Sequence, residues 1–229
     1  MAWPDENQRA HVAPWRFWPG GLALALCTLA GCSPVSRGSL QSIRLAVHGE
    51  RVDPTAESVA SSPYYQLQVN TPGGEAILIL AKTEQGRLGW YGTGDDIVVT
   101  RDGLIVKTVG LPQNLDDSAF TQRDPFHEGL QHVTAPIDYP RRMDWSPGYR
   151  YGYVLQAHLV PGATEDIDIL GTVRRLRRID ERLSGPGVDL TNRYWIDPVD
   201  GFIWKSRQYV APGYPVETIQ LRPYREKAP

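Results

Sequence analysis

Cysteine is scarce in this chain, and long hydrophobic runs are absent. The two cysteines, Cys27 and Cys32, both lie near the N-terminus, so the rest of the chain has no thiol for a disulfide or a metal ion. The longest strongly apolar run, Leu22–Ala30, has nine residues, whereas a membrane-spanning helix needs about 20. The formal net charge of −2 argues against nucleic-acid binding by bulk charge.

The sequence motifs of common enzyme classes are missing as well. The chain has no Gly-x-Ser-x-Gly elbow and no phosphate-binding Gly-Lys loop. His127 and His132 are five positions apart, one more than the spacing that places two zinc ligands on one helical face. Asp197 and Asp200 are typical of a tight turn. We therefore expect no catalytic residues, no metal site and no cofactor.

The N-terminal segment has the order of a bacterial secretory signal. Arg9 and Arg16 precede the apolar run, and the small residues of Leu29–Cys32 end it. This ending resembles the lipobox of bacterial lipoproteins. The resemblance implies cleavage before Cys32, a diacylglycerol thioether on its sulfur and an acyl chain such as palmitate on its amino group. Two or more acyl chains hold a protein stably at a membrane.

Three segments follow from this interpretation. Residues 1–31 are a signal peptide, 32–60 are the lipidated N-terminus and a linker with a short helix at 43–47, and 61–229 are a single β-rich domain. An Asp after the lipidated cysteine retains enterobacterial lipoproteins in the inner membrane. Ser33 at that position resembles outer-membrane cargo, so we expect an outer-membrane lipoprotein that faces the periplasm.

The remaining composition predicts β-structure, with 22 Gly, 19 Pro, 11 Tyr and 7 Trp. The clearest hairpin joins 97–100 to 104–108 through Asp102-Gly103. Local periodicity favours a helix over 167–183, and 111–140 is expected to be loop and short helix. In all we expect nine or ten strands, near 65–69, 76–81, 88–91, 97–100, 104–108, 149–160 (closed by Pro161), 194–196, 202–210 and 216–221.

Several blocks resemble the YjbF-type, GfcB-like lipoproteins of exopolysaccharide and group 4 capsule operons. They are Asn192–Pro198, Gly201, Ile203–Gln208, Tyr64-Tyr65, Ile77–Leu80, Trp90 and Val99–Leu111. The resemblance covers about 60–229 and implies a mainly β fold, a strongly curved antiparallel sheet or open barrel with a few short helices. The resemblance also implies that 172–183 is a strand, although the local periodicity favours a helix there. The implied role is a non-enzymatic accessory in polysaccharide production or export.

Aromatic and polar side chains are the candidates for binding a glycan or a partner protein. Aromatic faces stack on sugar rings, and a period of two places Trp204 on one strand face with two polar residues. The alternative is that these aromatics fill the core. The candidates are Trp90, Tyr194, Trp195, Trp204, Ser206 and Gln208.

The expected partners are the membrane, through the lipid anchor, and polysaccharide or secretion-system proteins. The arginines within 174–182 are either a solvated face or a site for an anionic polymer. Two other functions stay open. One is a lipid carrier, because a curved half-barrel can hold an acyl chain. The other is a glycan-modifying enzyme, which a pair of facing carboxylates in a cleft would indicate.

Overall fold

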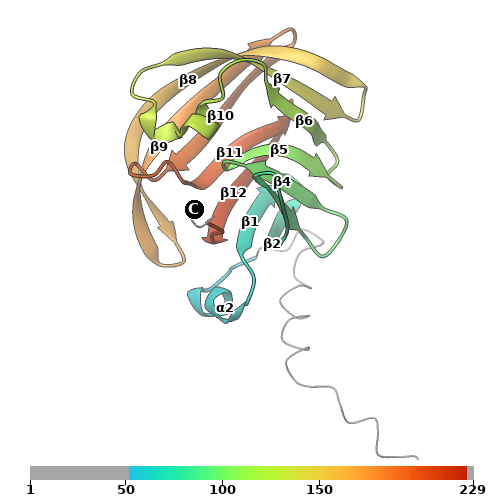
Figure 1. The fold of residues 1–229 in the computed structure, drawn as a ribbon. Coiled ribbons are helices and arrows are strands. Elements are labelled where there is room, and N and C mark those ends of the chain that lie inside the picture. The colour runs from blue at the N-terminus through green and yellow to red at the C-terminus, as the bar shows by residue number, and fades with distance from the viewer. Residues whose placement is uncertain (1–51, 226–229) are drawn as a thin grey trace, which may run out of the picture. The chain divides into compact units, whose positions relative to one another are not determined.

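One antiparallel sheet of twelve strands dominates the computed structural model, which describes residues 52–225. The strand order is β5-β4-β3-β2-β1-β12-β11-β10-β9-β8-β7-β6, so almost every strand pairs with its neighbours in the chain (Figure 1). The strands are β1 Gln66–Thr71, β2 Gly74–Glu84, β3 Arg87–Tyr91, β4 Ile97–Arg101, β5 Leu104–Val109, β6 Asn114–Phe120, β7 Ile137–Ser146, β8 Arg150–Ile169, β9 Thr172–Gly185, β10 Val188–Ile196, β11 Ile203–Ala211 and β12 Tyr214–Arg222.

The two edge strands, β5 and β6, are consecutive in the chain and meet in space, so the sheet is a nearly closed barrel. Side chains bridge the seam between them: the Leu115 N–H donates to Thr108 Oγ1 at 2.9 Å. Gln208 of β11 accepts from the Ile105 N–H at 2.9 Å and donates to the Gly103 carbonyl at 3.3 Å. Main-chain groups of β5, of β6 and of the turn before β5 thus find side-chain partners at the seam. The fold class expected from the sequence is confirmed.

Two strands lie where loop and short helix are expected. β6 and β7 fall within or across 111–140, and only α3 (Pro125–Glu128) and the 3₁₀ helix η1 (Leu130–His132) match that expectation. The inward face of β7 carries Arg141 between Tyr139 and Met143. A charged residue at a core position hides the alternation that predicts a half-buried strand.

The β8–β9 hairpin corrects two further expectations. β8 continues past Pro161 to Ile169, and a register shift between Pro161 and Thr164 accommodates the missing N–H of proline. The segment 172–183 is a strand, as the family resemblance implies. Leu176 and Ile179 are buried in different clusters on the two faces of β9, which produces the three-residue spacing that favours a helix.

The packed domain begins earlier than residue 61. The helix α2 (Ala56–Ser61) starts at a Thr55–Ser58 capping box and buries Val59. Val52 is buried and donates its N–H to Glu75 Oε2 at 3.2 Å. The signal peptide, Cys32 and the helix expected at 43–47 lie outside the described residues. Within 52–225, no helix is long and apolar enough to cross a membrane.

Candidate functional site

A buried ion pair occupies the barrel interior between β7, β9 and β10. Arg141 Nη1 lies 3.0 Å and 2.9 Å from the two carboxylate oxygens of Glu181, and both side chains are almost fully buried. Tyr139 and Tyr194 donate their hydroxyls to Glu181 at 2.7 Å each, and Asn192 donates its amide at 2.9 Å. These five residues are called the Glu181 network below.

Burial and the contacts within the Glu181 network shift the pKa values of Glu181, Tyr139 and Tyr194. Burial alone would raise the pKa of Glu181, but the Arg141 guanidinium and the three donated hydrogen bonds outweigh it, so this pKa lies below its ordinary value. Burial and the Glu181 charge raise the pKa of both Tyr139 and Tyr194 well above the ordinary value. Both carboxylate oxygens are occupied and enclosed, which marks the network as structural.

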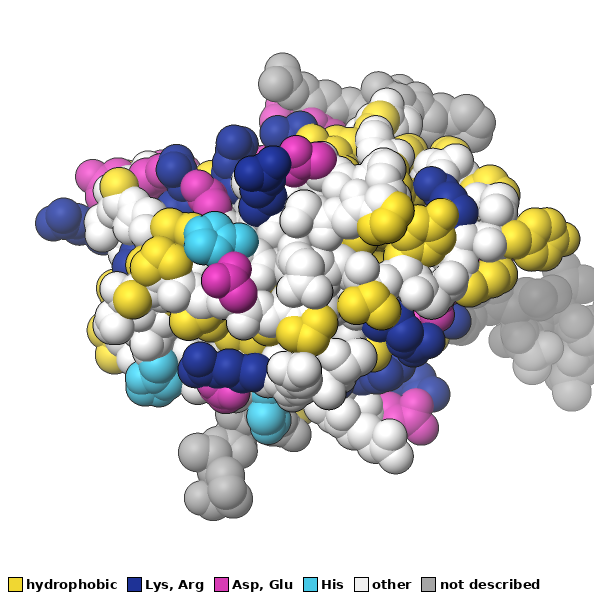
Figure 2. Space-filling model, turned by 90° about the horizontal axis from the view of Figure 1, so that it is seen from above, with side chains coloured by type: hydrophobic (Ala, Val, Ile, Leu, Met, Phe, Trp, Pro, Cys, Tyr) yellow, Lys and Arg dark blue, Asp and Glu magenta, His cyan; other side chains and the backbone are white. Residues whose placement is uncertain are grey.

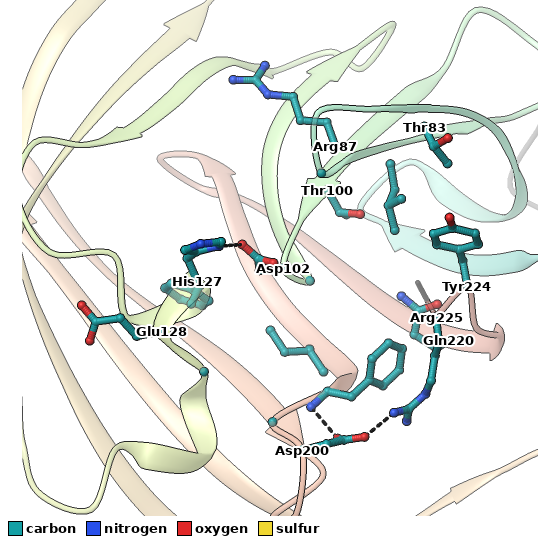
Figure 3. Close-up of a pocket in the computed structure, with 18 of the residues that line it drawn as sticks. Thr83, Arg87, Thr100, Asp102, His127, Glu128, Asp200, Gln220, Tyr224 and Arg225 are labelled. Carbon is teal, nitrogen blue, oxygen red and sulfur yellow. Dashed lines mark hydrogen bonds and ion pairs between the residues drawn. The ribbon is translucent and has the colours of Figure 1, made fainter. Parts of the chain in front are cut away.

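An open hollow of about 620 Å³ lies elsewhere on the sheet and is called the groove. Its walls come from the β2–β3 turn, the β4–β5 turn, α3 with η1, the β10–β11 turn and the segment after β12. Figure 3 shows His127 and Glu128 on one side and Thr83, Gln220 and Tyr224 on the other, with Asp200 between them at one end.

Local sequence signals fix the α3 wall of the groove. Asp124 caps α3 by accepting the N–H groups of Phe126 and His127 at 3.2 Å each, and Pro125 occupies the first turn. Asp124 also pairs with Arg101 of β4 at 2.7 Å. His127 Nδ1 then lies 3.3 Å from Asp102 Oδ2, in the turn that follows β4 (Figure 3).

The opposite end of the groove is built by the β10–β11 turn. Asp200 accepts the Phe202 N–H at 2.9 Å and pairs with Arg225, whose guanidinium lies 4.1 Å from the Phe202 ring centroid. Partial burial would raise the pKa of Asp200, but these donors outweigh it and hold the pKa below its ordinary value. Gly201 has a φ of 77°, a left-handed conformation that glycine adopts without strain, and an added Cβ, 1.9 Å from Gln131 Oε1, would displace the Gln131 amide.

Four of the six residues expected to bind a ligand are enclosed in the barrel interior. Trp90 and Tyr194 have no exposed surface, and Trp90 donates to Thr100 Oγ1 at 2.9 Å. Ser206 bonds Thr218 at 2.7 Å, and Gln208 donates to Ser206 at 2.8 Å besides closing the edge of β5. These four side chains are part of the core and have no surface to offer a glycan.

Trp204 does not share a face with Ser206 and Gln208. The β10–β11 register shifts between Trp195 and Ile196, which leaves Trp204 as an extra residue opposite β10. Trp204 therefore packs with Ile169 and Leu176 on the outer face of the sheet, under the tip of the β8–β9 hairpin. Only Trp195 is partly exposed among the four aromatics, and its role in binding stays a prediction.

The arginines of β9 are engaged by contacts within the chain. Figure 2 shows a face on which Lys and Arg side chains lie beside Asp and Glu side chains, so it carries no field of one sign. Arg177 reaches η1 and so supports the groove wall. The contacts are the Trp204 ring for Arg174, the Leu130 and Gln131 carbonyls for Arg177, Glu165 for Arg178 and Asp189 for Arg182.

Sequence reasoning missed the groove because its residues come from five separate segments. The signals that mark parts of it are the Asp102-Gly103 turn, the Asp124-Pro125 helix start and the 197–201 turn. Each predicts local structure only. Among residues 52–225, no group of three or more His, Cys, Asp or Glu side chains has the geometry to hold a metal ion.

The solved structures first define the class of fold. The chain resembles the crystal structure of the hypothetical lipoprotein YmcC from Escherichia coli K12, with a TM-score of 0.68 and 21% identity. The match covers 84% of this chain and 96% of that one. At this identity the likeness shows that the two proteins share a fold, a nearly closed antiparallel sheet.

The sequence comparisons then give the family. The model of the YjbF family, described as group 4 capsule polysaccharide lipoprotein GfcB, YjbF, matches residues 40–221. Two Escherichia coli K12 relatives are the uncharacterized lipoproteins YjbF, 26% identical over 88% of this chain and 96% of that protein, and GfcB, 23% identical over 88% and 97%. The chain belongs to the YjbF family of capsule-associated lipoproteins.

Proposed function

We propose that the protein is an outer-membrane lipoprotein, anchored through Cys32 and facing the periplasm, that acts as a non-enzymatic accessory in capsule or exopolysaccharide assembly or export. The single observation that carries this proposal is the family match over residues 40–221. The apolar run ending in Leu29–Cys32 supports the anchor, and Ser33 supports the outer membrane.

The state of the groove carboxylates supports a binding role over glycan cleavage. Hydrolysis of a glycosidic bond commonly needs two carboxyl groups that are free to exchange protons or to attack the sugar. The four groove carboxylates all have partners: Lys82 for Glu84, His127 for Asp102, Arg123 for Glu128 and Arg225 for Asp200. The buried Glu181 carboxylate is occupied by Arg141 and cannot meet a substrate.

The packing of the interior gives no support to an acyl carrier. A site for an acyl chain is an apolar cavity. Within 52–225, core side chains and the Glu181 network fill the interior of the barrel, and the groove walls carry charged and polar groups.

A deletion strain tests the proposed role. We expect it to lose most of its secreted polysaccharide and to recover it with the wild-type gene. Cys32→Ser is expected to accumulate without restoring secretion, because it lacks the acyl anchor. Labelling with a fatty acid should mark the wild-type protein, in the outer-membrane fraction, and leave Cys32→Ser unmarked. Normal secretion in the deletion strain would contradict the role, and a labelled Cys32→Ser protein would contradict the anchor.

A further inference from the structure

We propose that the groove binds an uncharged stretch of a glycan, with Tyr224 as a stacking surface and the amides of Gln131 and Gln220 as hydrogen-bond partners for sugar hydroxyls. This inference rests on the proposed function and names the ligand that the accessory would hold. The groove volume of about 620 Å³ lies within the range of about 300–1,000 Å³ that is typical of ligand sites.

Unused hydrogen-bond acceptors in the groove wall are the first argument. Gln220 is only 8% exposed, and its Oε1 has no donor. Gln131 Oε1, in the α3–η1 wall, is also buried without a donor. A buried carbonyl oxygen without a donor costs about 1–3 kcal/mol. The terminal torsion of a glutamine side chain is soft, so either amide can turn its oxygen toward a ligand hydroxyl.

The aromatic lining is the second argument. Tyr224 lies in the wall beside Gln220 (Figure 3), and its ring meets Tyr65 edge-on with centroids 5.1 Å apart. The ring is thereby held in place by its edge contact. A fixed aromatic ring next to carbonyl acceptors suits a sugar, which presents C–H groups on one face and hydroxyl donors at its rim.

The charged groups of the lining pair with one another, which favours an uncharged ligand. The lining carboxylates pair as follows: Glu84 with Lys82, Asp102 with His127, Glu128 with Arg123 and Asp200 with Arg225. A polymer segment that carries carboxylates or phosphates would have to compete with these carboxylates for the cations, whereas hydroxyl groups find amide acceptors on both sides of the groove.

Fragment binding to the full-length lipoprotein in detergent tests this inference. The probe is the polysaccharide secreted by the strain that carries the gene, cut into oligosaccharides and separated by anion exchange into uncharged and acidic fractions. We expect the uncharged fraction to bind, and Gln220→Leu, Gln131→Leu and Tyr224→Ala to weaken binding at least about five- to tenfold each. Titration calorimetry gives the affinities.

Gln66→Leu is the matched control. Gln66 is 6% exposed and has an Oε1 without a donor, as Gln220 has, but it does not line the groove. We expect this variant to bind like the wild-type protein. Binding confined to acidic fragments, no binding of either fraction, or equal binding by the groove variants would overturn the inference. Loss of secretion in the deletion strain together with any of these results would leave the proposed function standing.

Discussion

Two polar regions lie inside the same sheet, and they differ in how fully their hydrogen bonds are satisfied. Both carboxylate oxygens of Glu181 accept two or more hydrogen bonds, from Arg141, Tyr139, Tyr194 and Asn192. In the groove wall, Gln220 Oε1 is buried without a donor. The first region is closed to solvent, and the second opens to it.

This difference separates a structural role from a binding role. A buried charge without its partner is strongly destabilising, so a saturated pair such as Glu181–Arg141 is required by the fold. An acceptor that the fold leaves unpaired contributes no stability and is available to a ligand. The variants below test whether stability depends on the Glu181 network and glycan binding depends on the groove.

The largest effect is expected for Glu181→Ala. This variant leaves the Arg141 guanidinium buried without a counter-charge, and we expect the free energy of unfolding to fall by about 3–5 kcal/mol. Asp189→Ala is the control, because it removes only an exposed ion pair with Arg182 on the next strand and should leave the urea midpoint in place. Equal losses in the two variants would show that the network is not a stability determinant.

The double variant Glu181→Leu with Arg141→Met sharpens this result. Removing both charges leaves no uncompensated ion, so we expect the double variant to be more stable than Glu181→Leu alone by about 1–3 kcal/mol. Urea unfolding of the wild type, Glu181→Leu, Arg141→Met and the double variant completes the double-mutant cycle. Losses that simply add would mean that the two charges do not act as a unit.

The pH dependence of stability follows from the same network. The pKa of Glu181 is lower in the folded protein than the ordinary value of 4.5, so its contribution is present above about pH 4.5 and is lost as the pH falls through the folded pKa. The raised pKa values of Tyr139 and Tyr194 mean that stability falls again above about pH 10. Glu181→Gln should weaken the acid-side loss in urea unfolding measured from pH 3 to pH 7; an unchanged profile would assign that loss to other carboxylates.

The smallest effect on stability is expected for Gln220→Leu. Replacing a buried amide oxygen that has no donor removes a desolvation penalty, so the free energy of unfolding should stay the same or rise by at most about 1 kcal/mol. Thermal unfolding of Gln220→Leu and of the wild-type protein under the same conditions measures this change in stability. A loss as large as that of Glu181→Ala would place Gln220 among the residues that the fold requires.

The sequence predicts the parts of the fold whose signals are local. The hairpin between β4 and β5 is confirmed, with Asp102 and Gly103 at positive φ as Asp-Gly turns require. β7 is not predictable in this way, because Arg141 at an inward position makes sense only with Glu181, forty positions later. The inward-facing residues of a strand are suited to the side chains of neighbouring strands, and local sequence signals do not show which strands become neighbours.

The candidate binding residues show the same limit. Period-two alternation places Trp204 with Ser206, but a bulge against β10 turns Trp204 to the outer face. Ser206 and Gln208 are polar because they bond Thr218 and the edge of β5 inside the barrel. A bulge and an interior hydrogen bond both depend on which strands become neighbours, which local periodicity does not encode.

The most direct test of the division between the two regions is polysaccharide secretion by the deletion strain carrying Gln220→Leu, with Gln66→Leu as control and protein levels matched by immunoblot. Secretion should fall several-fold with Gln220→Leu, although the protein accumulates normally, and should stay at the wild-type level with Gln66→Leu. Wild-type secretion by Gln220→Leu, in a strain that the wild-type gene rescues, would contradict a binding role for the groove.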